Sequence, residues 1–198
     1  MGNNIIFVAI TGGSGAGKST LAMALQDKYP DKIGVIQLDD YFKPAVDAPK
    51  MGEYVNWDHP DALYFDKFYQ DLGDLAAGKT VVINTKNERL NPEYKHTEQR
   101  ISVEFQPKPI MLVEGYLVLH DERIRNLMTT SVWLEVAHSV RWKRRVHFKD
   151  DVYEKKVLVP MYEKFVAPTK VFAEHIIDVN DIETKDVVKK LEDIIASL

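Results

Sequence analysis

The chain has 198 residues, a formal net charge of −4 and no cysteine. This length suits one globular domain, so we expect a single domain over residues 1–198. The acidic balance argues against a nucleic-acid partner, because such proteins usually carry net positive charge. The lack of cysteine excludes disulfides and thiolate metal sites, and the apolar runs are too short to span a bilayer. With no leader sequence, the simplest prediction is a cytoplasmic protein without a membrane partner.

Short apolar runs that favour strands alternate with segments that favour helices. The strands are expected at 5–10, 33–38, 81–83, 110–113, 132–136 and 176–179, and the helices at 18–29, 60–77, 121–127, 138–149, 152–166 and 182–198. Such alternation predicts an α/β fold of three layers, with a mainly parallel sheet of about five strands. Two polar connections, 43–57 and 84–100, are too long for simple turns, and we expect substrate there.

A glycine-rich segment follows the first predicted strand and precedes the first predicted helix, which is the context that a P-loop requires. Its backbone amides would converge on phosphate oxygens, Lys18 would reach the terminal phosphates, and the Ser19 hydroxyl would bind magnesium. The alternative is a flexible Gly-Ser turn. The predicted nucleotide-binding residues are Gly12, Gly13, Ser14, Gly15, Ala16, Gly17, Lys18, Ser19 and Thr20.

Two further strands end in carboxylates. Glu114 closes an apolar strand, and parallel strands bring their carboxyl ends to the edge where the P-loop lies. We therefore expect Glu114 near the metal, although a carboxylate at this position can also be a helix cap or a surface residue. Asp39 follows another strand and is the predicted catalytic carboxylate, which accepts or orients the proton of an attacking hydroxyl. The alternative is that Asp39 and Asp40 only start a turn.

The segment 54–59 places aromatic and acidic side chains before a helix with proline in its first turn. Asp58 can hold a vicinal diol with two oxygens, while Trp57 or Tyr54 can cover a ring face. A plainer interpretation, in which Asp58 or His59 caps the helix and Trp57 is core, fits the local chemistry equally well.

A basic cluster lies late in the chain. Its arginines, which are three and four residues apart, share a helical face, and three lysines follow. We expect a short lid at about 149–157 that closes on the transferred phosphoryl group, although a solvated charged face explains the same pattern. The cluster comprises Arg141, Arg144, Arg145, Lys149, Lys155 and Lys156.

These motifs together resemble the uridine kinase branch of the P-loop kinases, which also holds phosphoribulokinase-like and nicotinamide riboside kinases. The likeness runs nearly end to end. Its narrower elements are Asn-Trp-Asp-His-Pro-Asp-Ala at 56–62, Leu-Val-Glu-Gly at 112–115, Arg-Arg-Val at 144–146 and Pro-Thr-Lys at 168–170. The resemblance implies a P-loop NTPase fold like that of the nucleoside monophosphate kinases, with ATP and Mg²⁺ as cofactors.

Carried over by residue, the resemblance implies Asp39 as the catalytic carboxylate and Asp58 on the ribose hydroxyls, with Arg145 and Lys18 assisting catalysis. Arg145 would also contact phosphate or substrate, and His96 would lie in the acceptor pocket. The family's base-reading motif ends in arginine, whereas this chain has Glu98 there.

The function that we expect is ATP- and Mg²⁺-dependent phosphorylation of a nucleoside 5′-hydroxyl, with uridine or cytidine as acceptor. The alternatives are a nicotinamide riboside kinase, a kinase of another small alcohol such as pantothenate, and a nucleotide-dependent switch. Against the switch, the sequence lacks the Asn-Lys-x-Asp motif that reads guanine. A homo-oligomer is left open.

Overall fold

A parallel five-stranded sheet organises the molecule. The computed structural model describes residues 5–144 and 150–198. The strand order in this sheet is β2-β7-β1-β8-β9, and every pair of neighbours is parallel. The strands are β1 (Ile6–Thr11), β2 (Ile33–Gln37), β7 (Ile110–Glu114), β8 (Thr130–Glu135) and β9 (His175–Asp178). The prediction of a mainly parallel sheet inside an α/β fold is confirmed.

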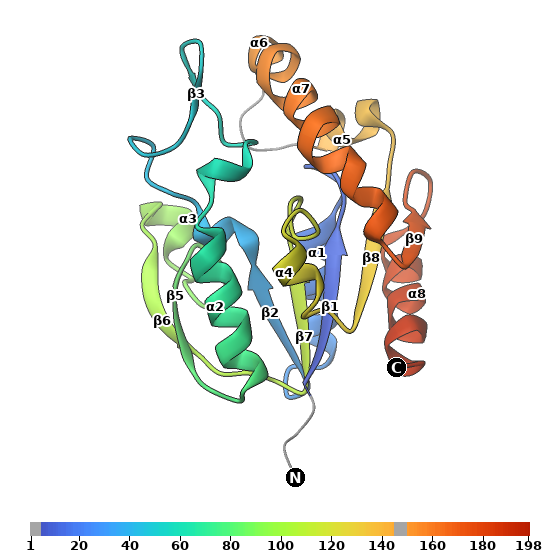
Figure 1. The fold of residues 1–198 in the computed structure, drawn as a ribbon. Coiled ribbons are helices and arrows are strands. Elements are labelled where there is room, and N and C mark those ends of the chain that lie inside the picture. The colour runs from blue at the N-terminus through green and yellow to red at the C-terminus, as the bar shows by residue number, and fades with distance from the viewer. Residues whose placement is uncertain (1–4, 145–149) are drawn as a thin grey trace.

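Helices cover both faces of this sheet (Figure 1). Successive side chains of a strand point to opposite faces. In β1, Phe7 and Ala9 therefore join one core cluster, whereas Val8 and Ile10 join the other. The first cluster includes side chains of α2 (Phe65–Ala76) and α4 (Glu122–Arg125), and the second those of α1 (Lys18–Lys28) and α8 (Thr184–Ala196). This burial on both faces explains why the strands are apolar throughout.

One predicted strand does not belong to the main sheet. The run at 81–83 forms β5 (Val81–Thr85), which pairs antiparallel with β6 (Ile101–Phe105) in a separate two-stranded sheet. In β5 the buried and exposed residues alternate, as expected for a strand with one solvated face. The loop between the two strands carries the short helix α3 (Tyr94–Thr97) and occupies most of the polar connection 84–100.

The helix predicted at 60–77 is interrupted. A 3₁₀ turn, η2 (Pro60–Ala62), comes before α2, because Leu63 has extended backbone angles and forms a bridge with Phe42. The other polar connection, 43–57, carries a small hairpin of β3 (Lys50–Met51) and β4 (Tyr54–Val55). The turn η1 (Leu38–Tyr41) directly follows β2.

A helical arm crosses the end of the sheet near the β3–β4 hairpin (Figure 1). Its turns alternate between α and π geometry, and Pro160 lies in the middle of the arm. Because proline donates no backbone hydrogen bond, a helix that contains one must loosen locally, and π turns are a common way to do so. The arm consists of α6 (Asp151–Tyr153), η3 (Glu154–Leu158), α7 (Val159–Met161), η4 (Tyr162–Val166) and η5 (Ala167–Phe172).

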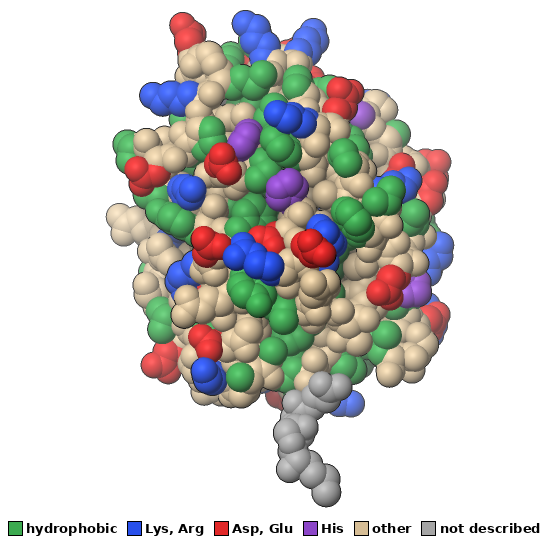
Figure 2. Space-filling model, in the orientation of Figure 1, with side chains coloured by type: hydrophobic (Ala, Val, Ile, Leu, Met, Phe, Trp, Pro, Cys, Tyr) green, Lys and Arg blue, Asp and Glu red, His purple; other side chains and the backbone are tan. Residues whose placement is uncertain are grey.

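The predicted lid at about 149–157 coincides in part with the start of this arm. Lys149 and Arg145 lie outside the described residues, whereas Lys155 and Lys156 are exposed on η3. On the face shown in Figure 2, acidic and basic side chains are interspersed over the surface. Within residues 5–144 and 150–198, no helix has both the length and the apolar character needed to cross a membrane.

Candidate active site

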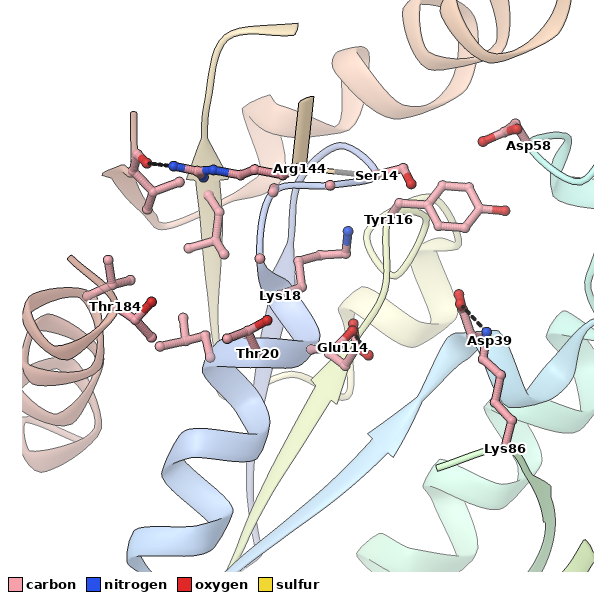
Figure 3. A pocket seen from close by; sticks show the side chains of 18 of the residues that line it. Ser14, Lys18, Thr20, Asp39, Asp58, Lys86, Glu114, Tyr116, Arg144 and Thr184 are labelled. Carbon is pink, nitrogen blue, oxygen red and sulfur yellow. Dashed lines mark hydrogen bonds and ion pairs between the residues drawn. The ribbon is translucent and has the colours of Figure 1, made fainter. Parts of the chain in front are cut away.

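A cavity of about 750 Å³ opens at the carboxyl end of the sheet. Its walls bring together the P-loop, the carboxylates that follow β2 and β7, and part of the 43–57 connection (Figure 3). Ligands of open parallel sheets gather at this end of the strands. The polar lining residues are Ser14, Lys18, Ser19, Thr20, Asp39, Asp58, Lys86, Glu114, Tyr116, Arg144 and Thr184.

The P-loop has the backbone that a phosphate cradle needs. Gly12 and Gly17 have φ angles of 132° and 92°, in the region that side chains disfavour. Gly17 is also the N-cap of α1, and residues Ser14 to Leu21 line the cavity. The backbone amides of the first helical turn, which have no partner within the helix, therefore lie at the cavity wall. The Lys18 ammonium donates hydrogen bonds to the carbonyl oxygens of Gly12 and Gly13, each at 3.1 Å. The loop is therefore closed around its own lysine.

Buried charges of opposite sign lie next to each other in this cavity. Lys18 is 8% exposed and Glu114 is 4% exposed. Burial lowers the pKa of Lys18, although the charges of Glu114 and Asp39 act in the opposite direction. Burial raises the pKa of Glu114, and the negative charge of Asp39 adds to this effect. Both pKa shifts disfavour the ionised forms, which means that the protein does not fully compensate these charges. A charged ligand that binds beside them can therefore gain favourable electrostatic interactions.

Glu114 and Ser19 form a group of oxygen ligands. The Ser19 hydroxyl donates to Oε1 of Glu114 at 2.8 Å, and the Gln37 amide donates to the same oxygen at 2.6 Å. Oxygen ligands suit Mg²⁺, which usually takes one or two protein groups and completes its shell with water and phosphate. Among the described residues, no group of three His, Cys, Asp or Glu side chains could hold a metal alone. The residues thus fit a magnesium ion that is shared with a nucleotide.

Asp39 lies on η1 and lines the cavity with a side chain that is 37% exposed. Burial acts to raise its pKa, but the charge and hydrogen bond of Lys86, with the charges of Lys18 and Arg100, outweigh this effect. The pKa of Asp39 therefore lies below its usual value. A carboxylate that remains ionised beside a P-loop can accept a hydrogen bond from a hydroxyl.

The segment 57–59, just before η2, contains one helix-capping residue and two cavity residues. His59 is the cap residue, since its Nδ1 accepts a hydrogen bond from the Asp61 amide. Asp58 instead lines the cavity, and its Oδ2 accepts a hydrogen bond from the Tyr153 hydroxyl at 2.8 Å. Trp57 is also a cavity residue, and its carbonyl oxygen accepts a hydrogen bond from Tyr116 at 2.7 Å. The capping interpretation is therefore right for His59 alone.

A second cavity, of about 540 Å³, lies beside the first and shares Phe42 and Trp57 with it. These two rings meet edge to face, with centroids 5.5 Å apart and an interplanar angle of 80°. The remaining walls combine apolar and basic side chains from the two polar connections. They are Lys43, Pro44, Ala45, Asn84 and Arg100, together with Tyr64, the N-cap residue of α2.

Two of the predicted substrate residues, Tyr54 and His96, do not line either cavity. Tyr54 packs edge to face against Tyr153, with centroids 5.6 Å apart. His96 is exposed on α3. Arg145 lies outside the described residues. Their roles in substrate binding stay predictions.

The structure adds residues that the sequence did not single out. Lys86 lines the first cavity beside Asp39, and Tyr116 lines it beside Trp57. Neither residue belongs to a motif that would have identified it. On the opposite side lies Arg144, a member of the predicted basic cluster, which donates hydrogen bonds to the carbonyls of Val179 and Asn180 in the connection before α8. The apolar side chains of this wall are Leu134, Val179, Ile182 and Val187.

Arg141 has a different position from the one that a cationic lid requires. It is 4% exposed, and its guanidinium lies 4.1 Å from the ring centroid of Tyr162. Its side chain and backbone fill the space beside Gly13 and Gly15, where any side chain would collide with them. Arg141 therefore packs against the P-loop and is buried there, so it is not part of a solvated charged face.

Most of the chain is similar to one protein family. The model of the family described as "Phosphoribulokinase / Uridine kinase family" matches residues 7–187. This chain belongs to that family. Uridine kinase from Streptococcus pyogenes serotype M5 is 34% identical over 202 residues, which cover 92% of each chain. Uridine kinase from Streptococcus gordonii is 33% identical over 89% of this chain and 88% of the relative.

A solved structure shows the same fold at low sequence identity. A protein from Bacillus stearothermophilus, described as a possible uridine kinase, superposes with a TM-score of 0.57 at 16% identity. The superposition covers 88% of this chain and 89% of that one. The predicted P-loop kinase fold and the resemblance to this family are thus confirmed. Membership of a kinase family also implies the use of ATP.

Proposed function

We propose that this protein transfers the γ-phosphoryl group of ATP to the 5′-hydroxyl of a nucleoside, with uridine or cytidine as the acceptor. The observation that carries this proposal is the meeting of Lys18, Glu114 and Asp39 around one cavity of a chain that belongs to the phosphoribulokinase / uridine kinase family. Streptococcal relatives that are 32–34% identical bear the name uridine kinase, and the chain spans 86–92% of their length.

The chemistry needs little beyond positioning and charge. The acceptor oxygen forms a bond to the γ-phosphorus while the bond from that phosphorus to the bridging oxygen breaks, so that ADP leaves. The acceptor proton passes to Asp39 and then to solvent. The P-loop amides and Lys18 stabilise the charge on the phosphate oxygens, and their burial in the cavity strengthens this effect.

The acceptor would lie between the two cavities. Asp58 lines the first cavity and offers carboxylate oxygens to the ribose hydroxyls. Phe42 and Trp57 line both cavities and offer ring faces to a planar base. The second cavity, beyond these rings, is the site that we propose for the base.

Magnesium would be held by Ser19 and Glu114. When bound there, the ion neutralises charge on the phosphate oxygens. We further propose that residues 1–198 act as one kinase domain, with a lid at about 149–157 and with Arg145 near phosphate. The cytoplasmic location and a homo-oligomeric state stay predictions.

A coupled assay of ATP consumption tests the function. The purified protein is given Mg²⁺ and ATP, with uridine, cytidine, nicotinamide riboside or pantothenate as acceptor. We expect turnover with uridine or cytidine and a nucleoside 5′-monophosphate as product. Turnover with only nicotinamide riboside or only pantothenate would show that the proposed acceptor is wrong. ATP hydrolysis that no acceptor stimulates would contradict the proposed phosphoryl transfer.

A further inference from the structure

Lys86 is in direct contact with Asp39, the proposed catalytic carboxylate. It follows the last residue of β5, and its ammonium donates a hydrogen bond to Oδ2 of Asp39 at 2.9 Å. Both side chains line the first cavity, and each is about one-third exposed, at 32% and 37%. In Figure 3 the lysine extends from the end of its strand to the carboxylate, on the side of the cavity away from Arg144.

The backbone at Lys86 is anchored to the same turn that carries Asp39. The amide of Lys86 donates to Oδ1 of Asp40 at 3.1 Å, and the Thr85 hydroxyl donates to Oδ2 of Asp40 at 2.7 Å. The side chain of Asp40 is only 2% exposed. Arg100, just before β6, joins the other side of the turn through Oδ1 of Asp40 and the carbonyl oxygen of Asp39. The β5–β6 hairpin therefore fixes where the lysine stands relative to Asp39.

A purely structural role explains this ion pair poorly. Pairs of exposed charges contribute about 0–1 kcal/mol to stability, and this pair is about one-third exposed. The turn is already held by the buried contacts of Asp40, which do not need the ammonium of Lys86. The turn therefore does not depend on the ion pair between Lys86 and Asp39, and a role of this pair in the cavity explains it better.

We propose that Lys86 is a positioning residue for phosphoryl transfer, which holds Oδ2 of Asp39 so that Oδ1 accepts the hydrogen bond from the acceptor hydroxyl. In the part of the chain that the structure describes, Oδ1 has no hydrogen-bond partner. The inference rests on the proposed function, because Lys86 acts through Asp39. It assigns a role to a residue outside every motif of the sequence.

The electrostatic surroundings of Asp39 support this role. The charged groups that face it come from four elements and from its own turn. They are Lys86 after β5, Lys18 of α1, Arg100 before β6, Glu114 of β7 and Asp40. The charge of Lys86 is the largest influence that lowers the pKa of Asp39, and Asp39 in turn holds the pKa of Lys86 above its usual value against the effect of burial.

The first test compares two lysine variants. Lys86→Met keeps an unbranched side chain, one atom shorter, and removes the charge. We expect kcat to fall by about tenfold to a hundredfold because the carboxylate loses its orientation. The acid limb of the kcat profile should also move to higher pH, since the pKa of Asp39 rises without the ammonium. Lys86→Arg should restore part of kcat and the position of the acid limb.

Lys79→Met is the matched control. Lys79 lies just before the other end of β5 and forms a 2.9 Å ion pair with Asp74, away from both cavities. This variant should keep kcat and its pH profile. Equal losses in the Lys79 and Lys86 variants would mean a general effect on the hairpin and would overturn the inference, as would wild-type kcat and pH dependence in Lys86→Met.

A second measurement does not depend on activity. The carboxyl group of Asp39 is titrated by NMR in labelled protein and assigned by its loss in Asp39→Asn. We expect a higher pKa in Lys86→Met than in the wild type or in Lys79→Met, and an unchanged titration would overturn the inference. If the wild type phosphorylates no nucleoside, the proposed function fails, and this titration still decides whether Lys86 controls Asp39.

Discussion

At the residue scale, the site depends on a few ionisable side chains that the protein leaves incompletely neutralised. Lys18 and Glu114 are both buried, and the pKa shift of each disfavours its charged form. Such groups cost stability in the absence of ligand, which is common at sites that bind charged substrates. Asp39 differs from them, because Lys86 keeps its pKa low.

Asp39→Asn tests the proposal that this carboxylate accepts the proton of the acceptor hydroxyl. The amide keeps the shape but cannot take the proton, so we expect turnover with uridine to fall by at least ~100-fold. The coupled assay measures this loss, and circular dichroism checks that the protein is folded. Asp66→Asn is the control, since Asp66 is 91% exposed on α2 and lines neither cavity. Near-normal turnover in Asp39→Asn would assign the proton transfer to another group.

Glu114→Gln tests the metal site. The amide can still accept from Ser19 and Gln37 but has no charge, so the Mg²⁺ concentration for half-maximal activity should rise by about tenfold or more. Titration of activity with MgCl₂ at fixed ATP measures this shift. An unchanged Mg²⁺ requirement would remove Glu114 from the metal site.

At the element scale, two peripheral elements reach the cavity through specific polar contacts. The β5–β6 hairpin holds the turn η1 through Thr85, Lys86 and Arg100. The helical arm reaches the acceptor side, where the Tyr153 hydroxyl donates to Asp58. Neither element belongs to the five-stranded sheet that carries the P-loop, so both reach the cavity from outside the sheet.

Tyr153→Phe tests the contact between the arm and the acceptor side. Loss of one hydrogen bond to a carboxylate is expected to raise KM for the nucleoside by about threefold to tenfold with little change in kcat, because Asp58 is less well held. Steady-state kinetics at saturating ATP separate the two constants. Tyr69→Phe, an exposed tyrosine of α2, serves as the control. A fall in kcat at constant KM would place the effect in the chemical step instead.

At the scale of the whole molecule, the sheet determines where the separate groups meet. β7 lies between β1 and β2, and the three strands are parallel. The P-loop, Asp39 and Glu114 therefore all lie at the carboxyl end of the sheet. Helices on both faces bury the strands and leave this end open to ligands. Binding therefore joins elements from distant parts of the chain.

Ligand binding should consequently stabilise the entire fold. At 100 times Kd, a nonhydrolysable ATP analogue with Mg²⁺ contributes about 2.7 kcal/mol, which corresponds to a rise in Tm of roughly 5–10 °C for a chain of this size. Differential scanning fluorimetry measures the rise. Lys18→Met should lose most of it, and a full shift in that variant would argue against the assigned phosphate site.

Several features were predictable because their signals are local. The glycines and Lys18 follow a strand within a few residues, and strands that end in Asp39 and Glu114 can be recognised from their apolar runs. The run 81–83 is predicted as a strand but 101–105 is not, so their antiparallel pairing is not predicted either. That pairing joins segments separated by a long loop, which no local pattern encodes.

Local patterns in the sequence predict the P-loop, the strands beside it and the carboxylates at their ends, because each pattern involves residues close together in the chain. The pairing of Lys86 with Asp39, the packing of Arg141 against the P-loop and the place of Trp57 in two cavities appear only in the folded chain. These contacts join side chains from separate elements. Their geometry follows from how the sheet, the hairpin and the helical arm pack together, and spacing along the chain does not contain it.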